Sequence, residues 1–176
     1  MHGLHHIGYW VPDLEAAVDH AVRTLGIGPF LVHRHVSFTT FRYRDGREIS
    51  EPSAFDHSAA FAAWGPVVLE LAEVHSVQDE LVRRYRMRDH GVGHVSWVAD
   101  DLEAESRRLE AAGCPLIHTA SAGAVSVAWH EGGLLFSHPI EVHRAGPAIL
   151  GMHPRLTAMA SDWDGQDPMR ALDAEV

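Results

Sequence analysis

The chain has 176 residues, 46% of them hydrophobic and 22% charged, which is enough for one domain or two small fused halves and argues against disorder. A formal net charge of −10 disfavours nucleic acid and anionic membrane surfaces as partners, because both bind basic faces. All 14 basic residues are arginine, which excludes lysine Schiff-base chemistry.

The first predicted strand covers residues 6–11, where alternate residues face opposite sides of a sheet. His5 is expected to point away from the side that His6 occupies. One side carries Ile7, Tyr9 and Val11, which should pack on a helix, and the other carries His6, Gly8 and Trp10.

A helix is predicted over residues 13–25, with Asp13 as its N-cap, apolar residues at helical spacing and Gly26 at its end. Strands are predicted over 29–36, 38–44, 57–64 and 67–74. Between them, residues 45–56 are rich in turn formers and would form a lid or pocket edge.

The second part of the chain repeats the first. After a predicted helical linker over residues 76–91, HVSWVADDLEAE at 94–105 aligns without a gap with HIGYWVPDLEAA at 6–17, so that His94 lies 88 residues after His6. A second helix is predicted over 101–112, and strands over 115–120, 124–130 and 134–144, whereas the tail 146–176 shows no clear period. Cys114 is the only cysteine, so neither a disulfide nor a cysteine zinc site is expected, and the thiol fits a reducing cytoplasm.

The repeat predicts an α+β fold in which two βαβββ modules form a curved, partly open mixed sheet around a metal cleft. Residues 1–75 would form the first module, 76–91 the linker, 92–145 the second module and 146–176 a C-terminal extension. No stretch of about 18 apolar residues predicts a membrane span, and the N-terminal residues lack the pattern of a signal peptide.

Two histidines and two glutamates could form a site in that cleft. His6 and His94 hold equivalent repeat positions, and the closing strand of each half carries a lone carboxylate, Glu70 or Glu141. A glutamate among apolar strand residues is costly to bury unless it is paired or bound to a metal. The four are therefore predicted to bind a divalent ion such as Zn, Mn, Co, Ni, Fe or Mg, leaving two adjacent positions of a six-coordinate ion for substrate oxygens. The alternative is that these polar residues are merely hydrogen-bonded.

Other side chains are candidates for the surroundings of this site. His143 shares a strand face with Glu141 and could hold that carboxylate from outside the ligand set. Apolar surface would come from Trp10 and Phe61, with Trp97 expected instead in the core. A basic rim for a coenzyme A thioester could come from Arg34, Arg42, Arg44 and Arg47.

The stretches HIGYWVPDLEAA, VVLELAEV, GVGHVSWVADDLEAE and HPIEVHR resemble the vicinal oxygen chelate, or glyoxalase-like, superfamily over residues 4–144. The methylmalonyl-CoA epimerase-like group is the most similar, and the resemblance implies the same four metal ligands. Epimerases usually have glutamine as the second ligand, whereas this chain has Glu70, as in lactoylglutathione lyases. Their base on the preceding strand corresponds to a position near Ala59, which has no carboxylate. Possible substitutes are Asp56, His57 and Glu51.

The resemblance implies a metal-dependent isomerase or lyase that acts on a small carbonyl or thioester substrate through a chelated enolate, with Glu141 or Glu70 as the base. Two alternatives stay open: a non-haem iron extradiol-type dioxygenase, and a non-enzymatic small-molecule-binding protein. The expected partner is a small-molecule substrate, the expected assembly a homodimer, and the expected location the cytoplasm.

Overall fold

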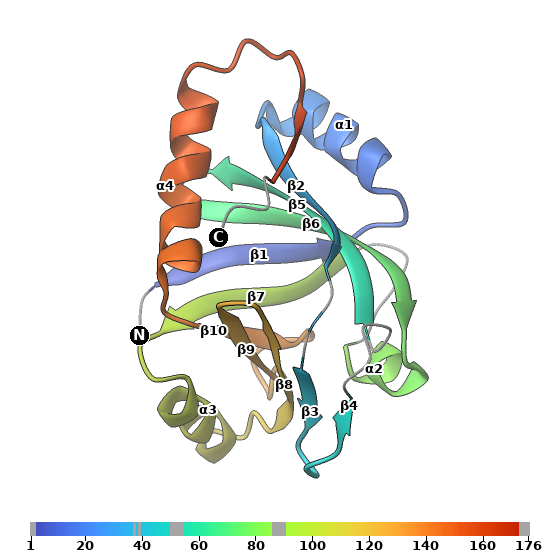
Figure 1. Cartoon of the computed structure of the whole chain (residues 1–176), viewed down its shortest axis with the longest axis vertical. Coiled ribbons are helices and arrows are strands. Elements are labelled where there is room, and N and C mark those ends of the chain that lie inside the picture. The colour runs from blue at the N-terminus through green and yellow to red at the C-terminus, as the bar shows by residue number, and fades with distance from the viewer. Residues whose placement is uncertain (1–2, 37, 39, 50–54, 86–90, 173–176) are drawn as a thin grey trace.

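The computed structural model describes residues 3–36, 38, 40–49, 55–85 and 91–172. Strands from this part of the chain form one eleven-stranded mixed sheet in the order β11-β2-β5-β6-β1-β7-β10-β9-β8-β3-β4 (Figure 1). Helices lie against both of its faces. This arrangement confirms the predicted α+β class with two βαβββ modules in one partly open sheet.

Each half contributes four strands and one helix in the same order. The first half contains β1 (Leu4–Trp10), α1 (Leu14–Leu25), β2 (Phe30–Val36), β5 (Phe55–Trp64) and β6 (Val67–Val77). The second half contains β7 (Gly91–Ala99), α3 (Leu102–Ala111), β8 (Leu116–Ala122), β9 (Val125–His130) and β10 (Ile140–Arg144). β1 pairs in parallel with β6, β7 pairs in parallel with β10, and the halves join where β1 and β7 pair antiparallel.

The two repeated helices begin with the same local contact. A side-chain oxygen of Asp13 accepts a hydrogen bond from the backbone N–H of Ala16 at 2.8 Å, and Asp101 accepts one from Ala104 at 2.8 Å. Each bond satisfies an N–H group that has no partner within the helix. α1 ends at Gly26, whose φ of 65° is left-handed and therefore suits glycine.

Strand alternation separates the sheet into an outer face under the helices and an inner face. On the outer face, α1 packs on Tyr9, Leu69 and Leu71, and α3 lies in one core with Val95 and Trp97. The inner-face residues of β1 and β7 are therefore those predicted, and Trp97 lies in the helix-covered core as expected.

The insertion in the first half adds an edge to the second half. β3 (Thr40–Tyr43) pairs with β8 and with the short β4 (Glu48–Ile49). Residues 50–54 of the predicted lid lie outside the described residues. The aromatic side chains of β3 pack into an inner-face core with Trp10, Phe55 and Trp129.

Three of the predicted elements differ from the structure. The predicted helix over 76–91 is wrong in extent, because β6 continues to Val77, α2 spans only Asp79–Arg84 and β7 starts at Gly91. The predicted strand over 134–144 is also too long: the chain turns through residues 132–138, and β10 begins only at Ile140.

The third difference is the tail, which forms α4 (Pro147–Ser161) and β11 (Met169–Ala171). Pro154 and Gly151 within α4 weaken a helical pattern, which explains why no period is visible in the sequence. α4 packs Leu156 against Leu31 and Val68 on the inner face, and it runs along the first half of the sheet (Figure 1). Among the described residues no helix combines the length and apolarity needed to cross a membrane.

Candidate metal centre

Four predicted site residues lie in two neighbouring rows at the centre of the inner face. In one row, Ser96 of β7 lies between His6 of β1 and Glu141 of β10. In the other row, Gly8 of β1 lies between His94 of β7 and Glu70 of β6. The two rows are related by the repeat, and each half therefore supplies one histidine and one glutamate to the same place.

The donor atoms of these residues converge. The Nε2 atoms of His6 and His94 are 3.0 Å apart. Oε2 of Glu70 is 3.2 Å from Nε2 of His6 and 3.1 Å from Nε2 of His94. Oε2 of Glu141 is 3.0 Å and 3.5 Å from the same two nitrogens. The sequence-predicted ligands thus form one cluster that joins both halves.

The cluster is buried and strongly charged. The exposed fractions are 2% for His6 and His94, 6% for Glu70 and 7% for Glu141. Burial alone would lower the pKa of His6, but its hydrogen bonds with Glu141 and Glu70 raise that pKa to about 9. Burial opposes ionisation of the two carboxyl groups, yet the neighbouring imidazoles hold the pKa of both Glu70 and Glu141 below the ordinary value. The carboxylates remain ionised and favour positive charge at their centre.

The residues fit a metal ion. Metal–nitrogen and metal–oxygen bonds of about 2.1 Å at right angles place neighbouring donors roughly 3.0 Å apart, close to the separations within this cluster. Two imidazoles and two carboxylates without a thiolate suit the hard and borderline divalent ions predicted from the sequence. Two buried carboxylates that both contact Nε2 of His6 also require a compensating positive charge.

Two further histidines lie against the cluster. Nε2 of His143 is 2.9 Å from Oε2 of Glu141, in agreement with the predicted shared face. His5 was expected to face away from His6, and this expectation is wrong: its Nδ1 lies 2.9 Å from Nδ1 of His6, and its Nε2 lies 3.0 Å from the carbonyl oxygen of Ile149 in α4. A register shift between Leu4 and His6 disturbs the alternation of β1 there.

Aromatic side chains surround one flank of the cluster. The ring centroid of Trp129 is 4.7 Å from that of His94, and the ring centroid of Trp10 is 6.0 Å from it. Trp10 was a predicted source of apolar surface, and Trp129 was missed because β9 gives no polar signal in the sequence. Phe61, the other predicted source of apolar surface, pairs across the sheet with Glu70 and packs with the core beneath α4.

Among the described residues of β5, no carboxylate reaches the cluster. Ala59 pairs with Ala72 of β6 and is fully buried. Asp56 lies 3.1 Å from Nδ1 of His35, which is exposed, and His57 stacks on Phe55. Glu51 lies outside the described residues. Among the residues that the structure describes, no carboxylate replaces the one missing near Ala59.

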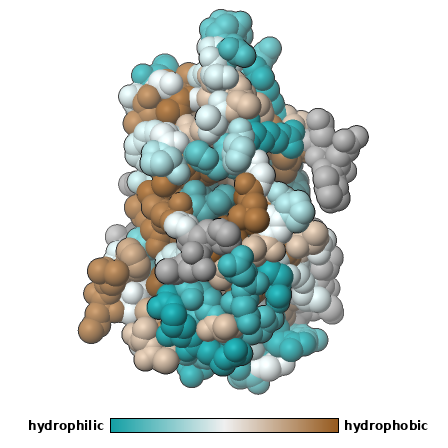
Figure 2. Space-filling view, turned by 90° about the vertical axis from the view of Figure 1, so that its left-hand side faces the viewer, coloured by the Kyte–Doolittle hydropathy of each residue, from teal (hydrophilic) through white to brown (hydrophobic). Residues whose placement is uncertain are grey.

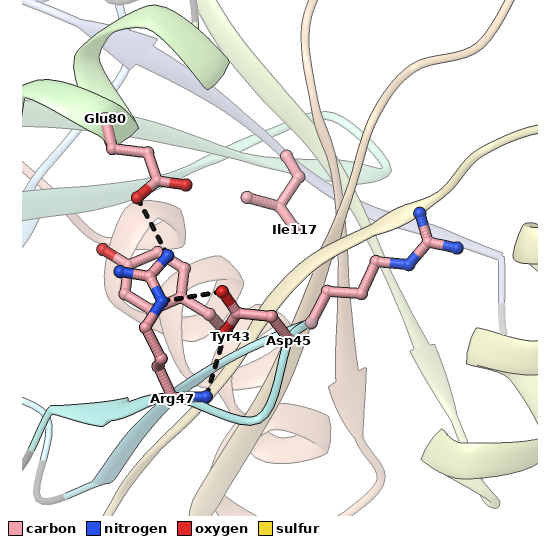
Figure 3. Close-up of a pocket in the computed structure, with 6 residues that line it drawn as sticks. Tyr43, Asp45, Arg47, Glu80 and Ile117 are labelled. Atoms are coloured by element: carbon pink, nitrogen blue, oxygen red, sulfur yellow. Dashed lines mark hydrogen bonds and ion pairs between the residues drawn. The ribbon is translucent and has the colours of Figure 1, made fainter.

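The predicted basic rim is largely neutralised. Arg34 forms an ion pair with Glu15 and Arg42 with Glu48, and Nε of Arg44 is 3.7 Å from Glu110. A cavity of about 310 Å³ lies away from the cluster and is lined by Tyr43, Arg44, Asp45, Arg47, Glu80 and Ile117 (Figure 3).

Within that cavity Arg47 is held on three sides. Its guanidinium lies 4.6 Å from the ring centroid of Tyr43, and its nitrogens are 2.7 Å from Asp45 and 3.2 Å from Glu80 (Figure 3). The guanidinium of Arg47 is therefore already paired within the protein, and this arrangement does not favour binding of the anionic groups of a coenzyme.

A smaller cavity lies beside the cluster. On the side of the molecule where α4 runs, apolar surface gathers at mid-height above a hydrophilic region (Figure 2). A cavity of about 190 Å³ is lined by Gly3, Leu4, His5, Pro66, Val98, Leu150 and His153. His5, which lines this cavity, also contacts His6, but none of the four cluster side chains lines it.

A family model described as the Glyoxalase/Bleomycin resistance protein/Dioxygenase superfamily matches residues 5–129. The chain belongs to this superfamily. The match contains the repeat and three of the four clustered side chains, and Glu141 follows it. No curated protein matches the chain in sequence.

Solved structures share the fold at low identity. Methylmalonyl-CoA epimerase from Mycobacterium tuberculosis is 19% identical, with a TM-score of 0.52 over 85% of this chain and 91% of the other. A Streptomyces coelicolor methylmalonyl-CoA epimerase in complex with 2-nitronate-propionyl-CoA is 16% identical, with a TM-score of 0.52 over 83% and 99%. A hypothetical protein from Bacillus halodurans is 16% identical, with a TM-score of 0.55 over 81% and 94%. At these identities the likeness concerns the fold alone.

Proposed function

We propose that the protein is a metal-dependent isomerase or lyase that acts on a small carbonyl compound. The observation that carries this proposal is the buried convergence of two imidazoles and two carboxylates, in which the Nε2 atoms of His6 and His94 are 3.0 Å apart. In this proposal His6, Glu70, His94 and Glu141 hold the ion. When bound, the ion would supply Lewis acidity toward a carbonyl oxygen.

The residues of the site would bind, orient and deprotonate the substrate. Glu141 would accept a proton from the carbon next to the carbonyl, and the resulting carboxylic acid would return that proton to the other face of the carbon or to its neighbour. This transfer is redox-neutral and needs no second reactant. Glu70 is the alternative base, since it has the same surroundings in the other half.

One observation favours a small carbonyl compound over a coenzyme A thioester as substrate. The arginines that could receive coenzyme phosphates are paired with carboxylates. The methylmalonyl-CoA epimerases with similar structures nevertheless make thioesters part of any substrate panel.

The test combines metal analysis with solvent-deuterium exchange. We expect the purified protein to contain close to one equivalent of divalent metal and to exchange the proton next to the carbonyl in at least one member of a panel of 2-hydroxycarbonyl compounds and acyl thioesters. Glu141→Gln should retain the metal and lose roughly 100- to 10,000-fold in exchange rate, as expected when a general base is removed. Asp19→Asn, an exposed residue of α1 that pairs with Arg23 of the same helix, is the control and should behave as wild type.

Three results would contradict the proposal. Unchanged exchange in both Glu141→Gln and Glu70→Gln would exclude a cluster carboxylate as the base. Oxygen uptake with a catechol and iron(II) would indicate the dioxygenase alternative. Ligand binding that persists in EDTA, with no exchange on any substrate, would indicate a binding protein.

A further inference from the structure

A fifth side chain directs its donor atom into the candidate metal centre. His143 lies two residues after Glu141 in β10 and therefore shares the inner face with it. Its Nε2 is 2.9 Å from Oε2 of Glu141, and its ring centroid is 5.5 Å from that of His6. Donor atoms of His6, Glu141 and His143 all lie within 4.8 Å of one another, as do those of His6, Glu70 and His94.

The two sets of donors indicate one ion rather than two. They share His6, and Nε2 of that ring is the atom that approaches both carboxylates. Its Nδ1 lies against His5 instead. Because one imidazole nitrogen binds one metal ion, both sets must surround the same centre.

The repeat shows that His143 is an addition made in one half only. His143 pairs with Val98 across β10 and β7, and the equivalent pair in the first half is Ala72 with Trp10. The first half therefore places a large ring beside a small methyl group. The second half places a small side chain beside an imidazole, and this exchange opens the space in which the His143 ring lies.

The remaining surroundings of His143 are consistent with a role inside the cluster. Its side chain is only 11% exposed. Its Nε2 contacts Glu141, and its Nδ1 is buried without a hydrogen-bond partner among the described residues. A buried imidazole whose polar contact is directed at a charged centre is placed to bind what that centre holds.

We propose that His143 is a fifth protein ligand, which gives a centre of three imidazoles and two carboxylates. The proposal rests on the proposed function, because it requires the same ion. Three nitrogen donors favour a borderline transition-metal ion such as Zn²⁺, Co²⁺, Ni²⁺ or Fe²⁺ over Mg²⁺. A six-coordinate ion would then keep one open position, so a substrate that binds through two neighbouring oxygens must displace a protein ligand.

Cobalt(II) is the probe for this proposal, because its visible absorption reports the number and type of its ligands. His143→Ala gives the second half the residue that the first half has at Ala72. We expect it to weaken Co²⁺ and Zn²⁺ binding at least tenfold in calorimetric titrations, to change the visible Co²⁺ spectrum, and to leave Mg²⁺ binding within twofold. Free imidazole should restore the wild-type spectrum by filling the space of the missing ring. His20→Ala, an exposed residue of α1, is the matched control and should bind Co²⁺ as wild type does.

The outcomes separate this proposal from the proposed function. If the wild-type protein binds no divalent ion, both fail. If it binds Co²⁺ and His143→Ala has the same affinity and spectrum, the fifth ligand is excluded and the four-ligand centre stands. Should the variant not fold, X-ray absorption of the Zn²⁺-loaded wild-type protein decides, with three imidazoles supporting the proposal and two overturning it.

Discussion

Gly8 is the residue that makes room for one of the candidate ligands. It lies in β1 between His94 and Glu70, and a Cβ atom added there would lie 2.1 Å from Cε1 of the His94 ring. The equivalent position in the second half is Ser96, which keeps its side chain. Glycine is therefore required at position 8 because the His94 ring lies against it. The backbone of the repeat does not require glycine there, since Ser96 holds the equivalent position.

Gly8→Ala should displace His94 and weaken metal binding. The contact of 2.1 Å cannot be accommodated without moving the ring, so we expect Zn²⁺ affinity to fall by at least tenfold. The free energy of unfolding without metal should fall by about 1–3 kcal/mol, as in other overpacked interiors. Calorimetric titration and urea denaturation measure the two effects. Gly3→Ala, where an added Cβ meets nothing within 4 Å, is the control, and equal affinities for both variants would contradict the argument.

At the scale of single residues, the cluster members could be predicted from the sequence. Each half carries a histidine and a glutamate at equivalent positions, on strands whose residues clearly alternate between the two faces of the sheet. His5 was misplaced, because the register shift in β1 has no sign in the residues LHHIG. Trp129 was missed for a related reason: apolar residues of β9 do not reveal which of them meets the ligands. Both errors concern three-dimensional neighbours rather than residue type.

β3, which lies in the insertion of the first half, connects that half to β8 of the second half. Phe41 of β3 stacks on His118 of β8 with ring centroids 4.0 Å apart, and the hydroxyl of Tyr85 lies 2.6 Å from a ring nitrogen of His118. Burial lowers the pKa of His118 to about 3, with Glu141 opposing and His130 reinforcing this shift. The contact between these elements therefore requires a neutral imidazole.

Acid should weaken this junction. Above pH 6.5 His118 is neutral in the folded and in the unfolded chain and contributes no pH dependence. Below pH 6.5 only the unfolded chain takes up a proton at this residue, until the pH approaches the folded-state pKa of about 3. The free energy of unfolding should therefore fall by about 1.4 kcal/mol from this residue between pH 8 and pH 5.5. Urea denaturation in EDTA excludes a contribution from metal release, and the difference between wild type and a variant without this imidazole isolates the fall that comes from His118.

His118→Gln keeps a hydrogen-bond acceptor for Tyr85 and removes the titration. It should lower stability at pH 8 yet show a shallower loss toward pH 5.5 than wild type. His33→Gln, an exposed residue of β2, is the control and should follow the wild-type slope. Parallel slopes for His118→Gln and wild type would show that this ring does not govern the acid response.

The repeated elements could be predicted because caps and periodicity are local signals. Asp13 and Asp101 start helices where the sequence indicates. The pairing of β3 with β8 is not local, since it joins the insertion of one half to the edge of the other. α4 was missed because Pro154 and Gly151 obscure its period and its buried face depends on Leu31 and Val68. The domain boundaries and the homodimer stay predictions.

At the scale of the whole molecule, the two halves meet at the centre of the sheet as well as where β3 pairs with β8. β1 and β7 pair at the centre of the sheet, and directly over this pair the donor atoms of both halves converge. A bound ion would cross-link the halves, with His6 and Glu70 from one and His94 and Glu141 from the other. It would also place positive charge between buried carboxylates in a chain whose formal net charge is −10.

Metal binding should therefore stabilise the entire fold. An ion that binds only the folded chain adds about 2.7 kcal/mol when its free concentration is 100 times Kd. For a chain of this length that increment corresponds to a rise in Tm of roughly 5–10 °C. Scanning calorimetry of EDTA-treated protein, repeated after addition of Zn²⁺, measures it. His94→Ala should lose the increment while keeping a cooperative transition, because the sheet that joins the halves does not depend on the ion. A wild-type Tm that is the same with EDTA and with Zn²⁺ would show that the ion does not link the halves, since a ligand bound to both must raise the free energy needed to separate them.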